Sequence, residues 1–596
     1  MSFLTENIRA LPSIQMQHDV VPHGSSPLGR IRQRIWLAHF VGSAFTAGVV
    51  VGTTPIAFQT NDDAVLKALA NGSYTGVPEI SLIFASPLFG AITSNLYGLA
   101  PSYDWYTFSQ VFLVVFSAIL LARSIGRGIA WQLNVLTIAV LGFVTCRFLF
   151  PLQFTQTSIL ATLSGTIWFA RSKLSDWRNI VLAMVLIQIG LSIRPEAGLL
   201  TLALFLFTTH SAFVLPHLKE RFEIVRNFIA RALLLVLIVI VTLLLQQFNT
   251  PPSPMHTNYS KLIEALSSND EGLLSIGFDK AEVAVLRETR GMYHDTPGSI
   301  ARVSLLSQNS LGFSLHDIVG ALETLVSREY YSYLVILAIL VSIWLTINRG
   351  SSRQLVTTIG STLGLTCIAM ILLNHRFGRL PYRMLMPIWA SIIILTLCSL
   401  LNLTNDRALQ ISGSATHLSG YSKTTRSLAP RKGLTVATLL VALMLCLSTV
   451  RYLSSFVTQY NSQSQNFKSI YSKVQCVSRT YPVVFIEGSS HRYMPGGAVV
   501  PSVSSSIYDL PVVVNDQLQY LAPFKRRAET LRVETDGSLL TSLELRGSAI
   551  LANQQVIKKL ETLIDSRRPR NTLRFRPDAT CGSDVWRIDK VSLPDS

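Results

Sequence analysis

Apolar segments long enough to cross a bilayer, or nearly so, recur along this chain and limit what it can fold into. A membrane-spanning helix needs about 20 mainly apolar residues. Runs of about that length lie at residues 35–56, 106–123, 130–149, 156–170, 179–193, 197–215, 230–248, 330–347, 354–373, 384–402 and 434–452. Of the 596 residues, 49% are hydrophobic and 14% are charged, whereas soluble domains carry roughly 25% charged residues. The sequence therefore predicts an all-α polytopic membrane protein with about eleven transmembrane helices.

Basic residues in the short loops orient these predicted spans. If the N-terminal tail, residues 1–34, is cytoplasmic, every loop predicted to lie inside carries Lys or Arg residues, as the positive-inside rule requires. We therefore expect outer loops at 57–105 and 249–329 and a cytoplasmic linker loop at 403–433. The formal net charge of +17 is then explained by cytoplasmic loops and anionic lipid ligands. No DNA- or RNA-binding motif accompanies it, so nucleic acid is not an expected partner.

After the last apolar run the composition becomes that of a soluble domain. Residues 481–486, 510–514 and 584–591 predict buried strands, and 555–564 predict an amphipathic helix. We therefore expect residues 453–596 to form a small extracytoplasmic α/β domain. Cys476 and Cys581 fall in this region and can pair if it lies outside the cell. The chain has no CxxC spacing and no zinc-binding pattern.

Two adjacent carboxylates follow the first predicted span, in the sequence Asn61-Asp62-Asp63. Ionised groups beside lipid are costly, so they need a reason to be there. One reason is local, because Asn61 can cap a helix that begins at Asp62 and the helix dipole favours acids in its first turn. The other reason is catalysis, and the two are compatible. The rest of the outer loop 57–105 has mixed three- and four-residue apolar spacing, which predicts short helices on the membrane surface.

Arginines lie at the outer ends of several predicted spans, where the positive-inside rule disfavours them. The positions are Arg147, Arg194 (near enough in sequence to pair with Glu196), and Arg376, Arg379 and Arg383, which surround Tyr382. A single arginine at a helix end is explained by its long side chain reaching the lipid headgroups. Three arginines interleaved with aromatic residues instead favour a phosphate or pyrophosphate ligand, because guanidinium groups match its geometry.

Sugar transfer from a lipid-linked phosphate uses carboxylates and arginines together at the headgroup level. The acceptor hydroxyl needs a base, and the leaving phosphate needs cations. The segments 61–63, 72–79, 153–157 and 379–383 resemble a group of bacterial membrane proteins related to the GT-C type glycosyltransferases. This resemblance covers about residues 35–452. It implies a polyprenyl-phosphate sugar donor and a base among Asp62 and Asp63, of which we favour Asp62, nearer the membrane helix.

The remaining expectations follow from this reading. The protein would be a multi-pass enzyme of a bacterial cell membrane that glycosylates a cell-envelope glycan, glycolipid or protein, as in polysaccharide biosynthesis. Candidate substrate contacts are Asn61, Glu79, Glu196 and Tyr382. Some members of the superfamily need a divalent cation, Mg²⁺ or Mn²⁺, and others do not. Because the sequence shows no clear second acidic ligand set, it favours a reaction without a metal.

Three other functions stay open at this stage. An O-antigen polymerase or ligase would make the loop 376–383 primary and the aspartates secondary. A transporter or lipid flippase would use the arginines along a substrate path and the aspartates for proton coupling, although the centres of the predicted spans are nearly free of charge. A non-enzymatic envelope assembly protein would use its C-terminal domain as a binding module.

Overall fold

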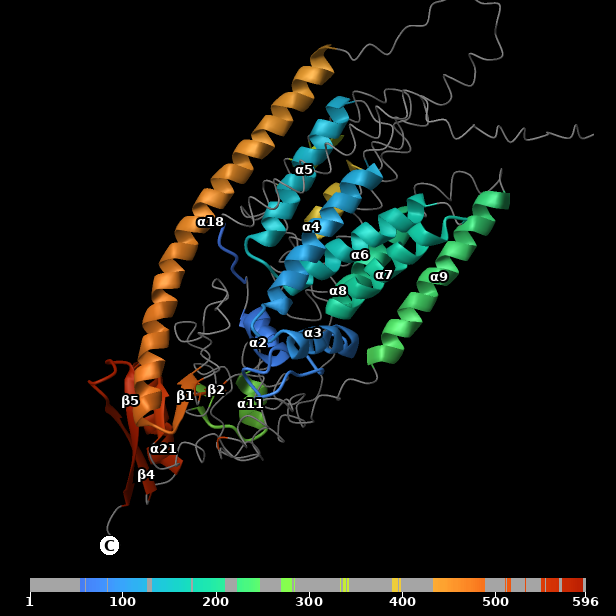
Figure 1. Ribbon diagram of the computed structural model, residues 1–596. Helices are drawn as coiled ribbons and strands as arrows, with labels where there is room; N and C mark the ends of the chain where they lie inside the picture. The colour runs from blue at the N-terminus through green and yellow to red at the C-terminus, as the bar shows by residue number, and fades with distance from the viewer. Residues whose placement is uncertain are drawn as a thin grey trace, which may run out of the picture. The chain divides into compact units, whose positions relative to one another are not determined.

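Helices of the computed structural model follow the apolar runs of the sequence (Figure 1). The structure describes residues 54–58, 61–125 without 83, 131–209 without 173–174, 222–246, 270–280, 283–284, 432–487, 512–515, 548–567 without 553, and 571–592, with scattered residues elsewhere. The N-terminal tail, the linker 403–433, almost all of the first predicted span and most of the outer loop 249–329 lie outside these residues. The predicted spans at 330–347, 354–373 and 384–402 lie largely outside them as well.

The second to seventh predicted spans coincide with helices. These are α4 (Trp105–Ile125), α5 (Trp131–Leu149), α6 (Phe154–Arg171), α7 (Trp177–Ile193), α8 (Pro195–Thr209) and α9 (Phe222–Gln246). Within the described residues, α4 and the stretch Thr438–Ser462 of α18 are long and apolar enough to cross a membrane, and α5, α7, α8 and α9 contain shorter apolar stretches. The count of eleven spans therefore stays a prediction.

α6 lies at the centre of this group and packs against α4, α7 and α8. Every residue from Phe154 to Phe169 is buried, including a row of hydroxyl side chains. These hydroxyls donate to backbone carbonyls, as Thr162 does to Ser158 (2.8 Å) within α6, and as Ser158 does to Gly190 (2.7 Å) across to α7. Small and hydroxyl-bearing residues thus let the helix backbones approach closely while most of the buried hydroxyls keep a hydrogen-bonding partner.

Proline sets the sharp boundary between α7 and α8. A residue before proline is pushed out of the helical region, and Arg194 accordingly has φ −151° and ψ 95°. α7 therefore ends at Ile193, and Pro195 begins α8, where its missing N–H costs nothing. Arg194 therefore lies between α7 and α8, at the same end of the helix group as the start of α6.

At the opposite end, arginines close the C-terminal ends of helices. Arg171 donates to the carbonyl of Ser124 at the end of α4, and Arg231 of α9 donates to Ala170 and to Ser172 (2.7 Å to Ser172) at the end of α6. The last carbonyls of a helix have no partner within it, and cationic side chains satisfy them favourably.

Two short helices precede α4, but the described residues of α2 (Asn61–Ala70), from 63 to 70, are buried in the fold instead of lying on the surface as we predicted for the loop 57–105. α2 begins at Asn61, one residue before the expected start, and α3 (Pro87–Leu99) begins after Ser86, whose Oγ accepts from the N–H of Leu88 (3.3 Å). Several large apolar side chains around them are exposed, namely Val77, Ile80, Ile92, Leu99, Tyr103, Phe108 and Phe112. Exposed aromatic and aliphatic residues at one end of an apolar helix are typical of the membrane–water interface.

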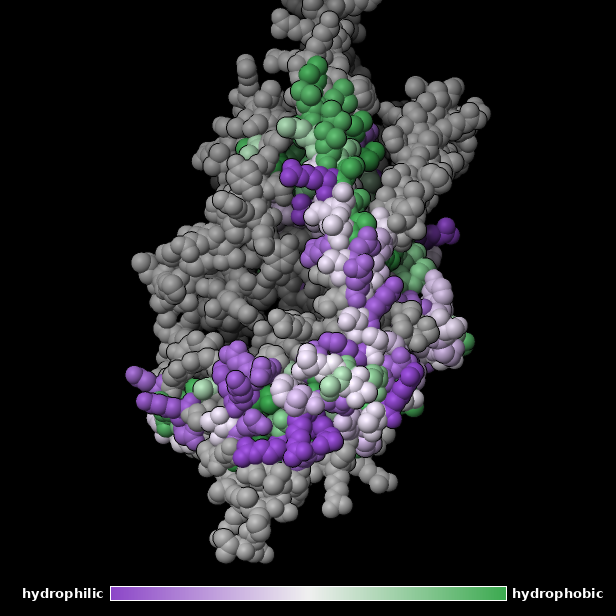
Figure 2. All heavy atoms as spheres, turned by 90° about the vertical axis from the view of Figure 1, so that its left-hand side faces the viewer, coloured by the Kyte–Doolittle hydropathy of each residue, from purple (hydrophilic) through white to green (hydrophobic). Residues whose placement is uncertain are grey.

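The last apolar helix is much longer than its hydrophobic run. We predicted a span at 434–452 followed by a separate domain, but α18 (Lys432–Thr480) continues for 28 residues beyond 452. No proline or glycine interrupts residues 453–480, so nothing breaks the helix where the apolar residues stop. Figure 2, which faces α18, shows apolar surface over its beginning and mainly polar surface further along. The exposed apolar residues of its first half include Leu440, Leu443 and Leu447.

A five-stranded sheet follows α18, with strands near three of the positions predicted from the sequence. Its order is β2 (Val512–Asn515), β1 (Val483–Glu487), β3 (Ser548–Leu551), β5 (Val585–Ser592) and β4 (Asn571–Pro577). β1 is parallel to β2 and β3, whereas β5 is antiparallel to β3 and β4. The amphipathic helix α21 (Gln554–Arg567) buries Val556, Ile557 and Leu560 in the core of this sheet.

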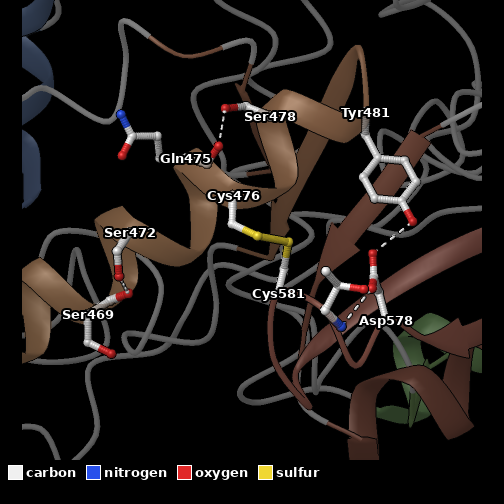
Figure 3. Close-up of a disulfide and its surroundings, with 9 residues drawn as sticks. Ser469, Ser472, Gln475, Cys476, Ser478, Tyr481, Asp578 and Cys581 are labelled. Carbon is white, nitrogen blue, oxygen red and sulfur yellow. Dashed lines mark hydrogen bonds between the residues drawn. A yellow bond between two sulfur atoms is a disulfide. The ribbon is translucent and has the colours of Figure 1, made fainter.

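A disulfide joins the end of α18 to the turn between β4 and β5 (Figure 3). Cys476 and Cys581 are 105 residues apart in sequence, with their Cα atoms 5.7 Å apart. Near it, Tyr481 donates to Asp578 (2.9 Å) and Lys473 pairs with Asp584 (3.0 Å). Pairing of the two cysteines, which the sequence allowed, thus anchors the sheet to α18.

The contact between α6 and α7 yields a stability prediction. A Cβ atom at Gly190 would lie 2.3 Å from Oγ1 of Thr162 and 2.8 Å from the carbonyl of Ser158. Gly190→Ala should therefore lower the free energy of unfolding by about 2 kcal/mol, since overpacking of a tight contact costs about 1–3 kcal/mol. Thermal unfolding in detergent measures the change. Gly142→Ala in α5 is the control, because a Cβ there meets nothing within 4 Å; equal effects of the two variants would contradict the prediction.

Candidate functional site

Asp63 is fully buried in the first turn of α2, with 0% of its surface exposed. Its Oδ1 accepts three hydrogen bonds, from the backbone N–H of Phe154 (3.0 Å), the hydroxyl of Tyr106 (3.2 Å) and Nε2 of Gln110 (3.3 Å). A buried carboxylate is tolerated only when hydrogen bonds replace its lost hydration. One oxygen atom thus connects the start of α2 to the outer parts of α4 and α6.

A second buried network extends from the same elements. Lys67, one turn after Asp63 in α2, is buried and pairs with Asp104 (Nζ to Oδ2, 2.6 Å). The Tyr97 hydroxyl donates to Oδ1 of Asp104 (3.1 Å) and accepts from the N–H of Tyr106 (3.1 Å). Burial, and then the Asp104 charge, raise the pKa of Tyr97 far above its ordinary value, so the phenol stays a donor. This network fixes the start of α4, and with it one of the three donors to Asp63.

Arg194 lies against two stacked aromatic rings. Its guanidinium carbon is 5.1 Å from the ring centroid of Phe84 and 5.0 Å from that of Phe154, and the two rings are 6.3 Å apart and tilted by 18°. Its Nε also lies 3.7 Å from the carboxylate of Glu196, the pairing expected from the sequence. The Glu196 side chain is 69% exposed, so this ion pair is weak. The aromatic faces therefore do more to hold the guanidinium in place.

Phe84 reaches Arg194 through an unusual backbone conformation. Its φ of 67° is in the left-handed region, which is rare for a bulky residue. A hydrogen bond anchors this turn to α7: the N–H of Ser86 donates to the carbonyl of Ser192 at the end of α7 (2.7 Å). Such strain persists only where the surroundings enforce it, and it concentrates at functional sites.

Phe154 joins the two candidate groups. Its N–H binds Asp63, and its ring packs under Arg194. The chain just before it is also fixed, because the N–H of Leu152 donates to the carbonyl of Ala57 (2.7 Å). The segment that precedes α2 and the segment that precedes α6 therefore run side by side, and Phe154 contacts one predicted acidic residue, Asp63, and one predicted basic residue, Arg194.

Arg147 lies seven residues before Phe154, in the last turn of α5. Its guanidinium carbon is 3.9 Å from the ring centroid of Tyr452 in α18 and 5.2 Å from that of Phe143. The Tyr452 hydroxyl donates to the carbonyl of Phe150, in the loop that leads to α6. Arg147 is thus held by aromatic residues, as Arg194 is.

The remaining predicted residues are placed in part or not at all. Asn61 and Asp62 lie in the first turn of α2, but their side chains are outside the described part of the chain. Glu79 is buried in the loop after α2, and its N–H donates to the carbonyl of Leu69 (2.9 Å). Arg376, Arg379, Tyr382 and Arg383 lie outside the described residues. Among the residues that are described, no group of three or more His, Cys, Asp or Glu side chains suits a metal ion.

Sequence reasoning missed the donors to Asp63. Gln110 could have been recognised from the sequence, because it is a large amide side chain inside the apolar run 106–123. A buried amide in a spanning helix needs a hydrogen-bonding partner. Tyr106 could not have been recognised in this way, because an aromatic residue at the start of such a run also suits the membrane interface.

Comparison with known proteins finds likeness in fold alone. No protein-family model and no curated protein matches this sequence. The crystal structure of ArnT from Cupriavidus metallidurans in the apo state aligns over 94% of this chain and 98% of its own, with a TM-score of 0.46 and 10% identity. The structure of the same protein bound to undecaprenyl phosphate aligns over the same shares, with a TM-score of 0.40 and 10% identity. ArnT is a GT-C glycosyltransferase, the superfamily that this sequence resembles. At this similarity the likeness assigns no role to any residue.

Loss of the Asp63 carboxylate should destabilise the protein strongly. Asp63→Ala leaves three donors from α4 and α6 without their acceptor, and each buried unsatisfied group costs about 1–3 kcal/mol. We expect a loss on the order of 3 kcal/mol or more in the free energy of unfolding, measured by thermal unfolding in detergent. Asp176→Ala is the control, because Asp176 is an exposed cap of α7 worth about 1 kcal/mol. A smaller loss for Asp63→Ala than for Asp176→Ala would contradict this assignment.

Proposed function

We propose that this chain is a membrane glycosyltransferase that moves a sugar from a polyprenyl-phosphate donor to an acceptor at the outer face of the membrane. In this proposal Asp62 is the general base, and Arg194 and Arg147 bind the donor phosphate. Arg376, Arg379 and Arg383 are proposed to complete the phosphate site. The acceptor is a cell-envelope glycan, glycolipid or protein.

One observation carries the proposal: Phe154 contacts both the acidic and the basic group. Its N–H binds the carboxylate that follows Asp62 in α2, and its ring supports the guanidinium of Arg194. Transfer from a lipid phosphate needs a base for the attacking hydroxyl and a cation for the leaving oxygen, within one short site. Phe154 contacts the residue next to the proposed base as well as the proposed cation, and this supports placing the two groups in one site.

The reaction would be a single displacement. The acceptor hydroxyl oxygen attacks the anomeric carbon of the donor sugar, its proton passes to the Asp62 carboxylate, and the bond from the anomeric carbon to the phosphate oxygen breaks. Polyprenyl phosphate leaves with the bonding electrons, and the arginines stabilise its added negative charge. Attack opposite the leaving group inverts the anomeric centre, which requires only one carboxylate near the attacking oxygen.

Hydrogen bonding separates the roles of the two aspartates. A base must come within hydrogen-bonding distance of the proton that it accepts. The Oδ1 atom of Asp63 already accepts three hydrogen bonds from protein donors. We therefore assign Asp63 to positioning α2 and Asp62 to catalysis, which agrees with the preference drawn from the sequence.

Several features support a location in the membrane with the site outside. The chain is 49% hydrophobic, and α4 and part of α18 have the length and composition of spans. The exposed aromatic residues Tyr103, Phe108 and Phe112 suit the interface at the end of α4 that is nearest Asp63. The disulfide Cys476–Cys581 suits an oxidising compartment, which supports an extracytoplasmic sheet. We propose that the sheet binds the acceptor.

Transport is the weaker alternative. Transporter sites lie near the middle of the membrane and use charged residues there. In the described parts of α4 to α8, the charged residues lie at helix ends: Arg123, Arg147, Arg171, Arg178 and Glu196. In α9, Arg231 lies at the level of the end of α6, whose carbonyls it binds.

Replacement of the proposed base should abolish transfer without unfolding the protein. Asp62→Asn should lower transfer of labelled sugar from undecaprenyl-phosphate donors at least about 100-fold, because general base catalysis contributes about 10²–10⁴. The melting temperature and the affinity for undecaprenyl phosphate, the lipid bound in the second ArnT structure, should stay unchanged. Full transfer activity in Asp62→Asn would remove the base assignment.

Replacement of Arg194 should weaken phosphate binding. Arg194→Gln removes a charge from the site, and a hydrogen bond to a charged group contributes about 1.5–3 kcal/mol, so affinity for undecaprenyl phosphate should fall about 10- to 100-fold. The matched control is Arg178→Gln, at the other end of α7, where the guanidinium lies 5.8 Å from the Trp177 ring centroid. Equal affinities of Arg194→Gln and Arg178→Gln in a direct lipid-binding assay would refute the phosphate role.

A further inference from the structure

The side-chain amide of Gln153 lies buried directly beside the candidate site. Gln153 precedes Phe154 at the start of α6 and has 0% exposed surface. Within the part of the chain that the structure describes, neither Nε2 nor Oε1 has a hydrogen-bonding partner. Its backbone carbonyl is used, since it accepts from the N–H (3.0 Å) and the hydroxyl (3.2 Å) of Thr157. The side chain does not cap the helix, so the described residues leave its two buried polar atoms without hydrogen bonds.

The rest of α6 shows that this is unusual for the helix. The other buried hydroxyls further along it bind carbonyls or amides, namely those of Thr157, Ser158, Thr162, Ser164 and Thr166. Thr155, two residues after Gln153, also has a buried Oγ1 without a partner among the described residues. Gln153 and Thr155 thus both lie at the end of α6 that meets Asp63 and Arg194. Burial of an amide without partners costs several kcal/mol, so such groups usually face a ligand or ordered water.

Both neighbours of Gln153 are held in place. The N–H of Leu152 donates to Ala57, and the N–H of Phe154 donates to Asp63. The backbone on either side of Gln153 is therefore fixed to the segment that carries the acidic pair. Preorganisation of this kind is what a recognition group needs, because little entropy is lost when its ligand binds.

The pair of unused atoms indicates the chemistry of the ligand. An amide offers donors at Nε2 and an acceptor at Oε1. An ionised phosphate only accepts and would satisfy Nε2 alone, whereas an ammonium group only donates and would satisfy Oε1 alone. Neighbouring hydroxyls of a sugar both donate and accept, so one ring can satisfy both atoms. A site built to bind hydroxyls also rejects ligands that lack them.

We infer that Gln153 binds two hydroxyl groups of the donor sugar and contributes to the choice of sugar. The inference rests on the proposed function and adds a sugar-binding residue to it. Gln153 lies beside Phe154, which contacts both the Asp63 and the Arg194 ends of the site.

The test compares wild type with Gln153→Met, an apolar side chain of similar size. Binding is measured for undecaprenyl phosphate and for undecaprenyl phosphate carrying glucose, mannose, galactose or arabinose. Wild type should bind at least one sugar-bearing lipid about tenfold or more tightly than the bare lipid phosphate, which corresponds to about 1.4 kcal/mol. Gln153→Met should lose that gain, keep its affinity for the bare lipid phosphate, and melt no lower than wild type, since it removes two unsatisfied buried atoms.

Gln188→Met is the matched control. Nε2 of Gln188 in α7 donates to the hydroxyls of Thr242 (3.2 Å) and Ser192 (3.5 Å), so its loss should lower the melting temperature and leave sugar discrimination intact. An equal fall in melting temperature for Gln153→Met would show that its amide is satisfied within the fold and would overturn the inference. The inference is also overturned if Gln153→Met still binds the sugar-bearing lipid more tightly than the bare lipid phosphate. The same holds if wild type shows no such preference for any of the four sugars; either result would point to a structural water at Gln153. Failure of wild type to bind undecaprenyl phosphate would instead overturn the proposed function itself.

Discussion

The buried carboxylate of Asp63 is the interaction on which the described site depends. A charge without exposed surface is stable only while its donors stay in place, and these donors come from the start of α6 and the outer part of α4. Each donor is in turn fixed by other contacts: Tyr106 by the hydroxyl of Tyr97, Gln110 by the hydroxyl of Thr157, and Phe154 by its place in the first turn of α6. The cost of burying one charge thus enforces the arrangement of three helices.

Arg194 is positioned by a different kind of force. The stacked rings of Phe84 and Phe154 attract its guanidinium face and so fix the orientation of the group. The strained turn at Phe84 is compatible with that role, because the carbonyl of Ser192 and the N–H of Ser86 hold the loop to the same helix end that carries Arg194. Hydrogen bonds therefore fix the acidic half of the site, while aromatic packing fixes the basic half.

The apolar runs predicted helices α4 to α7 well and the site only in outline, whereas the orientation drawn from loop charge stays a prediction. The boundaries of α4 to α7 lie within about two residues of the apolar runs, because a bilayer-length apolar run forms a helix almost regardless of context. α18 was predicted too short, since the end of hydrophobicity does not mark the end of a helix. The sequence could not decide which aspartate is buried, because the partners of Asp63 lie 43, 47 and 91 residues away. Nor could it predict the turn at Phe84, where neither glycine nor asparagine signals a left-handed residue.

Arg171 and Arg231 serve two purposes at once. In the sequence they count as the cytoplasmic charges that orient the chain, and in the structure they bind the terminal carbonyls of α4 and α6. Under the predicted orientation, two of the residues that would direct membrane insertion therefore also hold helix ends together. Replacing Arg171 and Arg231 to invert that predicted topology would also remove contacts among α4, α6 and α9, so orientation and stability would change together.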